Sequence, residues 1–182
     1  MIDLTTKRGL PNVVMIGGNP YSIYTDFRVW MRFEIALSKL RQDETMDVSY
    51  LFKNDMPSYC NFSELLTFSR PKSELPRNTK QSDAVVLDYE IDADYIYAAF
   101  MSQYGIDLCE IEELHWHKFL ALLKGLKDEK ICDIMSYRCY EPTNEKNDVY
   151  AELKLAWEID RITPEKQAEI DKFISYYELE DN

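Results

Sequence analysis

The feature that most constrains this chain is a pair of helix-periodic segments that meet at Gly105. From residue 88 to residue 104, large apolar side chains recur at steps of three and four, at Tyr89, Tyr95 or Ile96, Phe100 and Tyr104. This spacing predicts one amphipathic helix over 88–104. The glycine stands where a left-handed C-cap would end that helix.

The segment after Gly105 predicts a second helix. Asp107 and Glu110 have the spacing of a capping box, so we expect this helix to run from Leu108 to about Gly125. Its apolar residues form two faces, one with Leu108, Ile111, His115, Phe119 and Leu122, the other with Trp116, Leu120 and Leu123. A helix that is apolar on most sides is typical of the centre of a fold.

The rest of the chain predicts a hairpin and more helices. Residues 12–24 place two β-branched and aromatic runs around a Gly-Gly-Asn-Pro turn, which is typical of a β-hairpin. Helical spacing, with Thr25 or Asp26 as a first N-cap, predicts helices over about 27–41, 44–52, 58–69, 128–141, 144–159 and 164–177. The expected fold class is mainly α, with about eight helices in a compact bundle and a short N-terminal β-hairpin.

A stretch over 71–84 divides the chain. It holds two prolines and five charged residues, and its only apolar side chains besides proline are Leu75 and Ala84, which indicates a linker or a mobile loop. Charge changes at the same place, because residues 1–84 carry 11 basic and 10 acidic residues and residues 85–182 carry 10 and 23. We interpret 1–182 as a single domain with an N-terminal lobe (1–70) and a main helical lobe (85–182). Two separate lobes are the alternative.

Composition narrows the class of protein. The 13 tyrosines, 8 phenylalanines and 3 tryptophans favour a packed core, and the net charge of −12 disfavours nucleic acid as a partner. The acidic surface indicates either a solvated helical face or a face that attracts a basic partner. Apolar runs far shorter than the roughly 20 residues that span a bilayer, and no targeting segment, predict a soluble protein. Four cysteines without a CxxC pair predict reduced thiols in a cytoplasm.

Enzymatic sites are poorly supported. Glu112 and His115 have the E-x-x-H spacing of helical di-metal sites, but the only other histidine, His117, would point about 200° away on the same helix. No serine lies in a G-x-S-x-G elbow, and no G-K-[ST] follows Gly17-Gly18. The carboxylates between Asp88 and Asp94 are typical of a negative first helical turn. We expect no metal, no cofactor and no catalytic activity.

Several stretches resemble the bacteriophage Gp15 family. The likeness is carried by DYIYAAFMSQYGIDL at 94–108, LHWHKF at 114–119 and LLKGL at 122–126. TDFRVW at 25–30 and IMSYR at 134–138 are similar to that family's other hallmark stretches. The resemblance covers about 20–160 and is weakest over 43–87.

The resemblance implies a role in phage tail assembly. Genes of this family stand in the tail cluster of phages of Gram-positive bacteria, and this position implies a tail assembly chaperone. Such chaperones are described as coating the tape-measure protein and recruiting tail-tube subunits in the host bacterial cytoplasm. A tail-completion or baseplate component retained in the virion is the alternative. The resemblance implies no catalytic residues.

A chaperone of this kind requires a surface for its partner. A hydrophobic groove with an acidic rim would suit an amphipathic helix that carries basic residues. Because aromatic anchors dominate protein interfaces, the candidate contact residues are Tyr97, Tyr104 and Trp116. The competing interpretation places all three in the core, since they belong to the two central helices.

Overall fold

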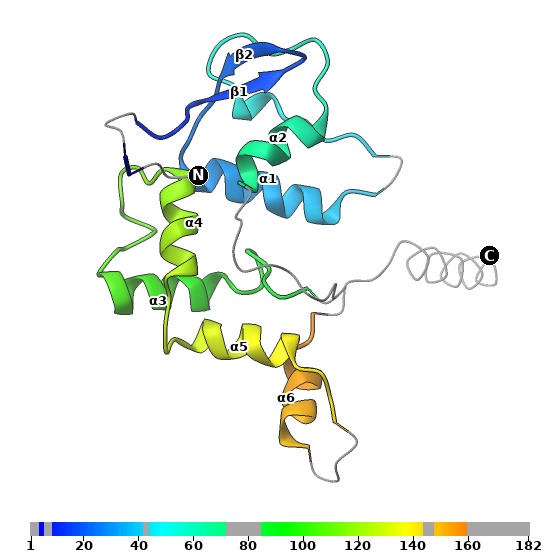
Figure 1. The fold of residues 1–182 in the computed structure, drawn as a ribbon, viewed down its shortest axis with the longest axis vertical. Helices are drawn as coiled ribbons and strands as arrows, with labels where there is room; N and C mark the ends of the chain where they lie inside the picture. The colour runs from blue at the N-terminus through cyan, green and yellow to red at the C-terminus, as the bar shows by residue number, and fades with distance from the viewer. Residues whose placement is uncertain (1–3, 6–8, 42–43, 72–84, 144–147, 160–182) are drawn as a thin grey trace, which may run out of the picture.

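The computed structural model describes residues 4–5, 9–41, 44–71, 85–143 and 148–159. Within them the chain forms a two-stranded antiparallel hairpin, six α-helices and one 3-10 helix (Figure 1). The strands are β1 (Val13–Ile16) and β2 (Asn19–Ser22), and the 3-10 helix is η1 (Ser49–Leu51). The α-helices are α1 (Phe27–Lys39), α2 (Phe62–Ser69), α3 (Ala93–Tyr104), α4 (Trp116–Lys124), α5 (Lys130–Cys139) and α6 (Val149–Trp157).

The hairpin forms where the sequence predicts it. Gly17 and Gly18 have φ angles of 56° and 81°, the positive values that a tight two-residue hairpin turn requires. Val14 and Ile16 point inward and are each 4% exposed, so alternate residues of β1 enter the core. The hairpin prediction is confirmed.

The elements pack in a chain of contacts from the hairpin to α6. β1 lies against α2, and Phe68 of α2 packs on Trp30 of α1 with ring centroids 4.4 Å apart. From there α1 lies against α4, α4 against α3, α3 against α5, and α5 against α6 (Figure 1). The centre of this arrangement is Phe119 of α4, which is fully buried and stacks on Phe27, Phe100 and Trp116 with ring centroids 5.1, 5.1 and 5.5 Å away. The segment predicted to be central therefore does supply the middle of the core.

One hydrophobic cluster joins residues from both sides of the predicted linker. Trp30 and Leu65 from the first part of the chain belong to the same cluster as Ile96 and Ile131 from the second. Hydrogen bonds cross the same boundary, since the indole N–H of Trp116 donates to the carbonyl of Ser69 at 2.8 Å. Residues 72–84, almost all of the predicted linker, lie outside the described residues.

The number of helices differs from the expected eight. The described residues contain six α-helices, and the predicted helix over 44–52 is reduced to η1. The reason is pairing with the end of the hairpin: Phe52 bridges Ile23, and the backbone N–H of Tyr24 donates to the carbonyl of Leu51 at 2.9 Å. The predicted helix over 164–177 falls outside the described residues.

Several helices are shorter than predicted. α2 begins at Phe62 instead of residue 58, because Asn61 is its N-cap and accepts the N–H of Ser63. α3 begins at Ala93 instead of residue 88, because the Asp88 carboxylate accepts the N–H groups of Glu90 and Ile91 and forms a turn. α4 begins at Trp116 instead of residue 108. Asp107 does cap backbone N–H groups, those of Cys109 and Glu110, but the capped segment is a turn.

The helix ends that depend on local capping lie where the sequence predicts them. The Asp26 carboxylate accepts the N–H of Arg28 at the start of α1, and Gly105 ends α3 with a φ of 62° and an N–H bond to the carbonyl of Met101. The mainly helical class with a short hairpin is therefore confirmed. In the part of the chain that the structure describes, no helix is long and apolar enough to span a bilayer.

Candidate functional site

Two hallmark stretches of the sequence lie directly against each other. The backbone N–H of Phe27 donates to the carbonyl of Leu114 at 2.8 Å, and that of Trp116 donates to the carbonyl of Thr25 at 2.7 Å. The Asp26 carboxylate also accepts the N–H of Leu114 at 3.1 Å. The stretches 25–30 and 114–119 thus form one clamp that joins α1 to α4.

Arg28 extends this clamp toward the turn before α4. Its guanidinium donates to the carbonyls of Leu108 and Ile111 at 3.0 and 2.7 Å and also pairs with Asp26 at 3.1 Å. In an α-helix those two carbonyls would accept from residues 112 and 115 instead. Arg28 therefore holds 108–111 in a non-helical course beside the start of α1.

A groove opens between α1, α3 and this non-helical segment. We call it the α1–α3 groove; it has a volume of about 520 Å³. Its apolar lining comes from all three elements and from the turn that precedes α3: Phe27, Met31, Tyr89, Ala93, Ile96, Tyr97 and Leu108. Arg28, Asp94 and Cys109 complete the lining. A concave, mainly apolar surface of this kind is typical of a binding site.

Acidic groups surround the groove. Asp94 is exposed at its edge, and the hydroxyl of Tyr97 donates to the Asp107 carboxylate at 3.1 Å. This hydrogen bond, with Glu110 nearby, raises the pKa of Tyr97 above its ordinary value. The only basic residue in the lining is Arg28, whose charge faces Asp26.

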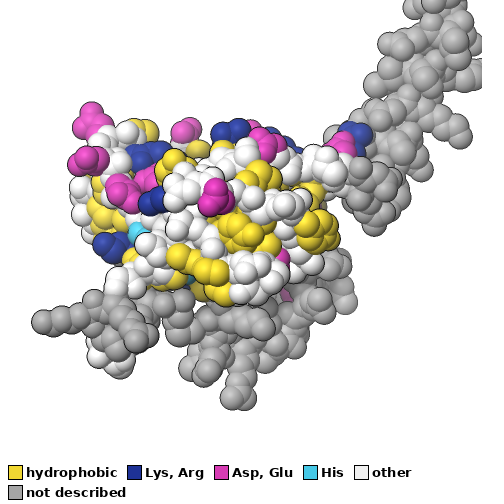
Figure 2. All heavy atoms as spheres, turned by 90° about the horizontal axis from the view of Figure 1, so that it is seen from above, with side chains coloured by type: hydrophobic (Ala, Val, Ile, Leu, Met, Phe, Trp, Pro, Cys, Tyr) yellow, Lys and Arg dark blue, Asp and Glu magenta, His cyan; other side chains and the backbone are white. Residues whose placement is uncertain are grey.

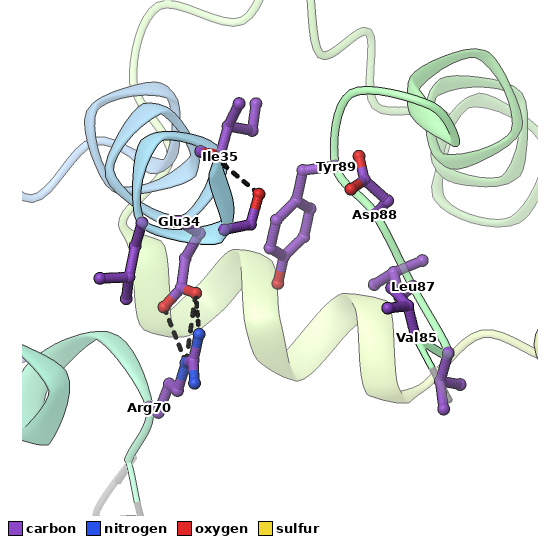
Figure 3. Close-up of a pocket in the computed structure, with 10 residues that line it drawn as sticks. Glu34, Ile35, Arg70, Val85, Leu87, Asp88 and Tyr89 are labelled. Carbon is purple, nitrogen blue, oxygen red and sulfur yellow. Dashed lines mark hydrogen bonds and ion pairs between the residues drawn. The ribbon is translucent and has the colours of Figure 1, made fainter. Parts of the chain in front are cut away.

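Tyr89 also lines a second cavity, of about 590 Å³ (Figure 3). Glu34 and Arg70 point toward each other in it, with 2.6 Å between their closest charged atoms, and the hydroxyl of Ser69 also donates to Glu34. Burial raises the pKa of Tyr89. Glu34 and Arg70 satisfy each other, and the third charged group of the cavity, Asp88, accepts the N–H groups of Glu90 and Ile91. This cavity therefore offers fewer groups for binding a partner than the α1–α3 groove does.

The hairpin end of the molecule carries a third surface feature. Figure 2 views the molecule from the hairpin end and shows a group of hydrophobic side chains on that face. The large apolar side chains exposed on the hairpin and the nearby loop are Val13, Met15, Tyr24, Met56 and Tyr59. Exposed apolar groups of this kind favour protein contacts.

Comparison with known proteins decides the family. The sequence model of the family described as Bacteriophage Gp15 protein matches residues 7–159. The chain belongs to the bacteriophage Gp15 family. No match is found among curated proteins or among solved structures. Membership in the Gp15 family indicates a structural or assembly protein of a phage that interacts with other phage proteins.

The structure separates the three aromatic candidates of this Gp15 family member. Trp116 is 1% exposed and lies in the core. Tyr104 is partly buried and donates to the carbonyl of Leu122 at 2.8 Å. Tyr97 alone lines the α1–α3 groove. Its contact with a partner remains a prediction.

Sequence reasoning missed the other groove residues, because they come from separate elements. Met31 and Leu108 are 77 positions apart in the chain and both reach the groove. The available signal was the run Asp-Leu-Cys-Glu-Ile-Glu-Glu over 107–113, in which four carboxylates accompany apolar residues without a basic one. Leu108 and Cys109 of that run line the α1–α3 groove, and Asp107 bonds to Tyr97 beside it.

The two histidines are closer than predicted. His115 precedes α4 as its N-cap instead of lying inside a helix, so its ring centroid is 5.3 Å from that of His117 and the predicted divergence is wrong. His115 donates from Nε2 to the carbonyl of Pro11 and accepts the N–H of His117 at Nδ1, while His117 Nε2 donates to the carbonyl of Phe68. Among the described residues, no group of three His, Cys, Asp or Glu side chains could hold a metal ion.

Proposed function

We propose that this protein is a non-catalytic tail assembly chaperone that binds the tape-measure protein, tail-tube subunits or both in the host bacterial cytoplasm. The observation that carries the proposal is the family match over 7–159, because the position of Gp15 genes in phage tail clusters implies this role. The α1–α3 groove with its acidic surroundings supports it, because an open apolar groove suits the helical segments of a long partner.

The lining of the groove supports binding rather than chemistry. Its polar side chains, Arg28, Asp94, Tyr97 and Cys109, include no histidine. Both histidines lie elsewhere. Three of their four ring nitrogens bond to backbone groups at Pro11, Phe68 and His117, and the fourth, His117 Nδ1, is buried. A general base beside a nucleophile, which acyl transfer requires, is therefore not provided by the histidines of this chain.

Co-expression with the tape-measure protein of the same phage tests the proposal. We expect a soluble complex that dissociates as salt is raised, because acidic and basic surfaces attract less when charges are screened. An unrelated acidic helical protein of similar net charge serves as the control. If the tape measure stays equally insoluble with and without this protein, the proposal is wrong.

Mass spectrometry of purified virions tests whether the protein leaves the particle. A chaperone that departs before completion is expected to be absent or far below one copy per tail. Stoichiometric recovery would support the alternative, a tail-completion or baseplate component, over the chaperone.

A further inference from the structure

We propose that the α1–α3 groove is the docking site for an amphipathic α-helix of a partner protein, and that lysine or arginine residues flank the apolar face of that helix. The inference rests on the proposed function, because it names the partner chemistry that a chaperone of helical proteins would use. It is carried by three properties of the groove: its apolar floor, its extension along α3 and the sign of the charges around it.

The floor is apolar and firmly positioned. Phe27, Ile96 and Leu108 are each at most 8% exposed, so the core beneath holds them in place. Met31 and Tyr97 are partly buried and border the open space. Because methionine adapts its shape to different apolar surfaces, it suits a site that accepts several related helix faces.

The groove continues as a stripe along one face of α3. Asp94, Tyr97 and Met101 follow each other at steps of three and four, so they lie on the same side of the helix. Met101 is 40% exposed and lies on the same side of α3 as Tyr97, one turn beyond the groove. From Ala93 to Met101 the stripe is about 12 Å long at 1.5 Å per residue, which matches about two turns of a docked helix.

The charges around the groove favour a basic partner. Asp94 and Glu110 are exposed, and Asp107 bonds to Tyr97 within the groove. Glu112 and Glu113 continue the same acidic segment and are exposed too. Arg28 does not offset them, since its guanidinium bonds to Asp26 and to two backbone carbonyls. Complementary charge of this kind steers a partner and sets its orientation.

The lining favours a helix over a small polar ligand. Pockets for small molecules place several free polar groups on an apolar wall to fix the orientation of the ligand. Among the described residues, the buried side-chain polar atoms without a hydrogen-bond partner are Tyr50 Oη and His117 Nδ1, and neither residue lines the groove. An apolar helix face requires no such groups.

Binding of two designed peptides to the full chain tests the inference. The probe is an 18-residue helix of leucine and lysine with leucine on one face, and its counterpart carries glutamate in place of lysine. We compare wild type with Asp94→Lys and with Asp133→Lys as the matched control, since Asp133 is also an exposed carboxylate in the first turn of a helix, α5. Met101→Glu is paired with Leu155→Glu, another exposed apolar position.

The expected result is binding of the lysine peptide with little or no binding of the glutamate peptide. Asp94→Lys should raise the Kd for the lysine peptide roughly fivefold or more, the equivalent of about 1 kcal/mol for a reversed surface charge. Met101→Glu should raise this Kd as well. Asp133→Lys and Leu155→Glu should change it by less than about twofold. NMR shifts of the wild-type Met101 methyl group and the Tyr97 ring on peptide addition are the second readout.

Three outcomes would overturn the inference. The first is equal weakening by Asp94→Lys and Asp133→Lys, which would indicate general charge attraction. The second is a loss of self-association in Met101→Glu by sedimentation, which would make a second copy the occupant. The third is a tape measure that wild type keeps soluble and that Asp94→Lys and Met101→Glu keep equally soluble. In that case the proposed function stands and the groove is excluded as its site.

Discussion

Asp92 and Arg138 form a two-pronged ion pair that is almost completely closed to solvent. The guanidinium nitrogens of Arg138 lie 2.6 and 2.9 Å from the two carboxylate oxygens of Asp92, and the side chains are 4% and 1% exposed. Arg138 also donates to the carbonyls of Val86 and Trp157. The pair therefore joins α5 to the start of α3, to the segment before it and to the end of α6.

Removal of either partner should be costly, because it leaves the other charge buried and unpaired. We expect Arg138→Met to lower the free energy of unfolding by about 3–5 kcal/mol, as for other broken buried pairs. Urea denaturation followed by circular dichroism measures it. Lys39→Met is the control, since Lys39 and Glu90 form an exposed pair that contributes at most about 1 kcal/mol. Equal losses in the two variants would contradict this account.

Loss of the Asp26 side chain should destabilise the protein more than loss of Asp148, the N-cap of α6. Asp26→Ala removes the N-cap of α1 and leaves the N–H of Leu114 without its carboxylate acceptor. We expect a loss of about 2–4 kcal/mol, which combines a lost cap with an unsatisfied N–H group. Asp148→Ala removes the N-cap of α6, a helix with no buried residue, and should cost less. A larger loss for Asp148→Ala in thermal and urea unfolding would refute the ranking.

Gly125 and Tyr104 should be energetically coupled. A Cβ atom at Gly125 would lie 2.9 Å from the Tyr104 hydroxyl oxygen, which donates to the carbonyl of Leu122 at 2.8 Å. Gly125→Ala should therefore displace that hydroxyl and destabilise the protein by about 1 kcal/mol. In a Tyr104→Phe background the same change should be neutral or stabilising, because alanine restricts the unfolded chain. Additive effects in the double-mutant cycle would exclude the contact.

His117 should make stability depend on pH. It is 5% exposed, and burial lowers its pKa from the ordinary value of about 6.5. The unfolded chain therefore takes up a proton at a higher pH than the folded protein does. The stabilisation is complete above about pH 6.5 and is lost as pH falls from there through the lower pKa of the folded state.

His117→Gln isolates this effect, because glutamine can still donate to the carbonyl of Phe68 but does not titrate near neutral pH. We expect the stability difference between wild type and variant to shrink as pH falls from 7 to about 5. Carboxylates titrate in both proteins and cancel in the comparison. A constant difference across this range would show that His117 does not contribute.

Local patterns predicted the elements that local contacts stabilise. α1 begins at the predicted cap Asp26, and α3 ends at the predicted glycine, Gly105, because a cap or a positive φ is decided by residues within one turn. The same holds for the hairpin turn at Gly17 and Gly18. Each of these features is determined by residues that lie next to it in the sequence.

The segment 106–115 shows where local patterns fail. Its spacing satisfied a helical template, and Asp107 does cap two N–H groups. Arg28, however, lies 80 positions before Leu108 and donates a hydrogen bond to its carbonyl, and the Asp26 carboxylate accepts the N–H of Leu114. These long-range partners take up groups that a helix would bond internally, so the segment stays non-helical with a turn at 108–110. Its residues Leu108 and Cys109 line the α1–α3 groove.

The sequence by itself determined the helical class, the hairpin, the acidic second half and, through its hallmark stretches, the family. All of these depend on composition or on spacing within a few residues. Only the tertiary structure decided that Asp92 meets Arg138, that Trp116 lies in the core and that Met31, Tyr97 and Leu108 share a groove. Those relationships join distant residues, and packing selects them among many pairs that the same local patterns allow.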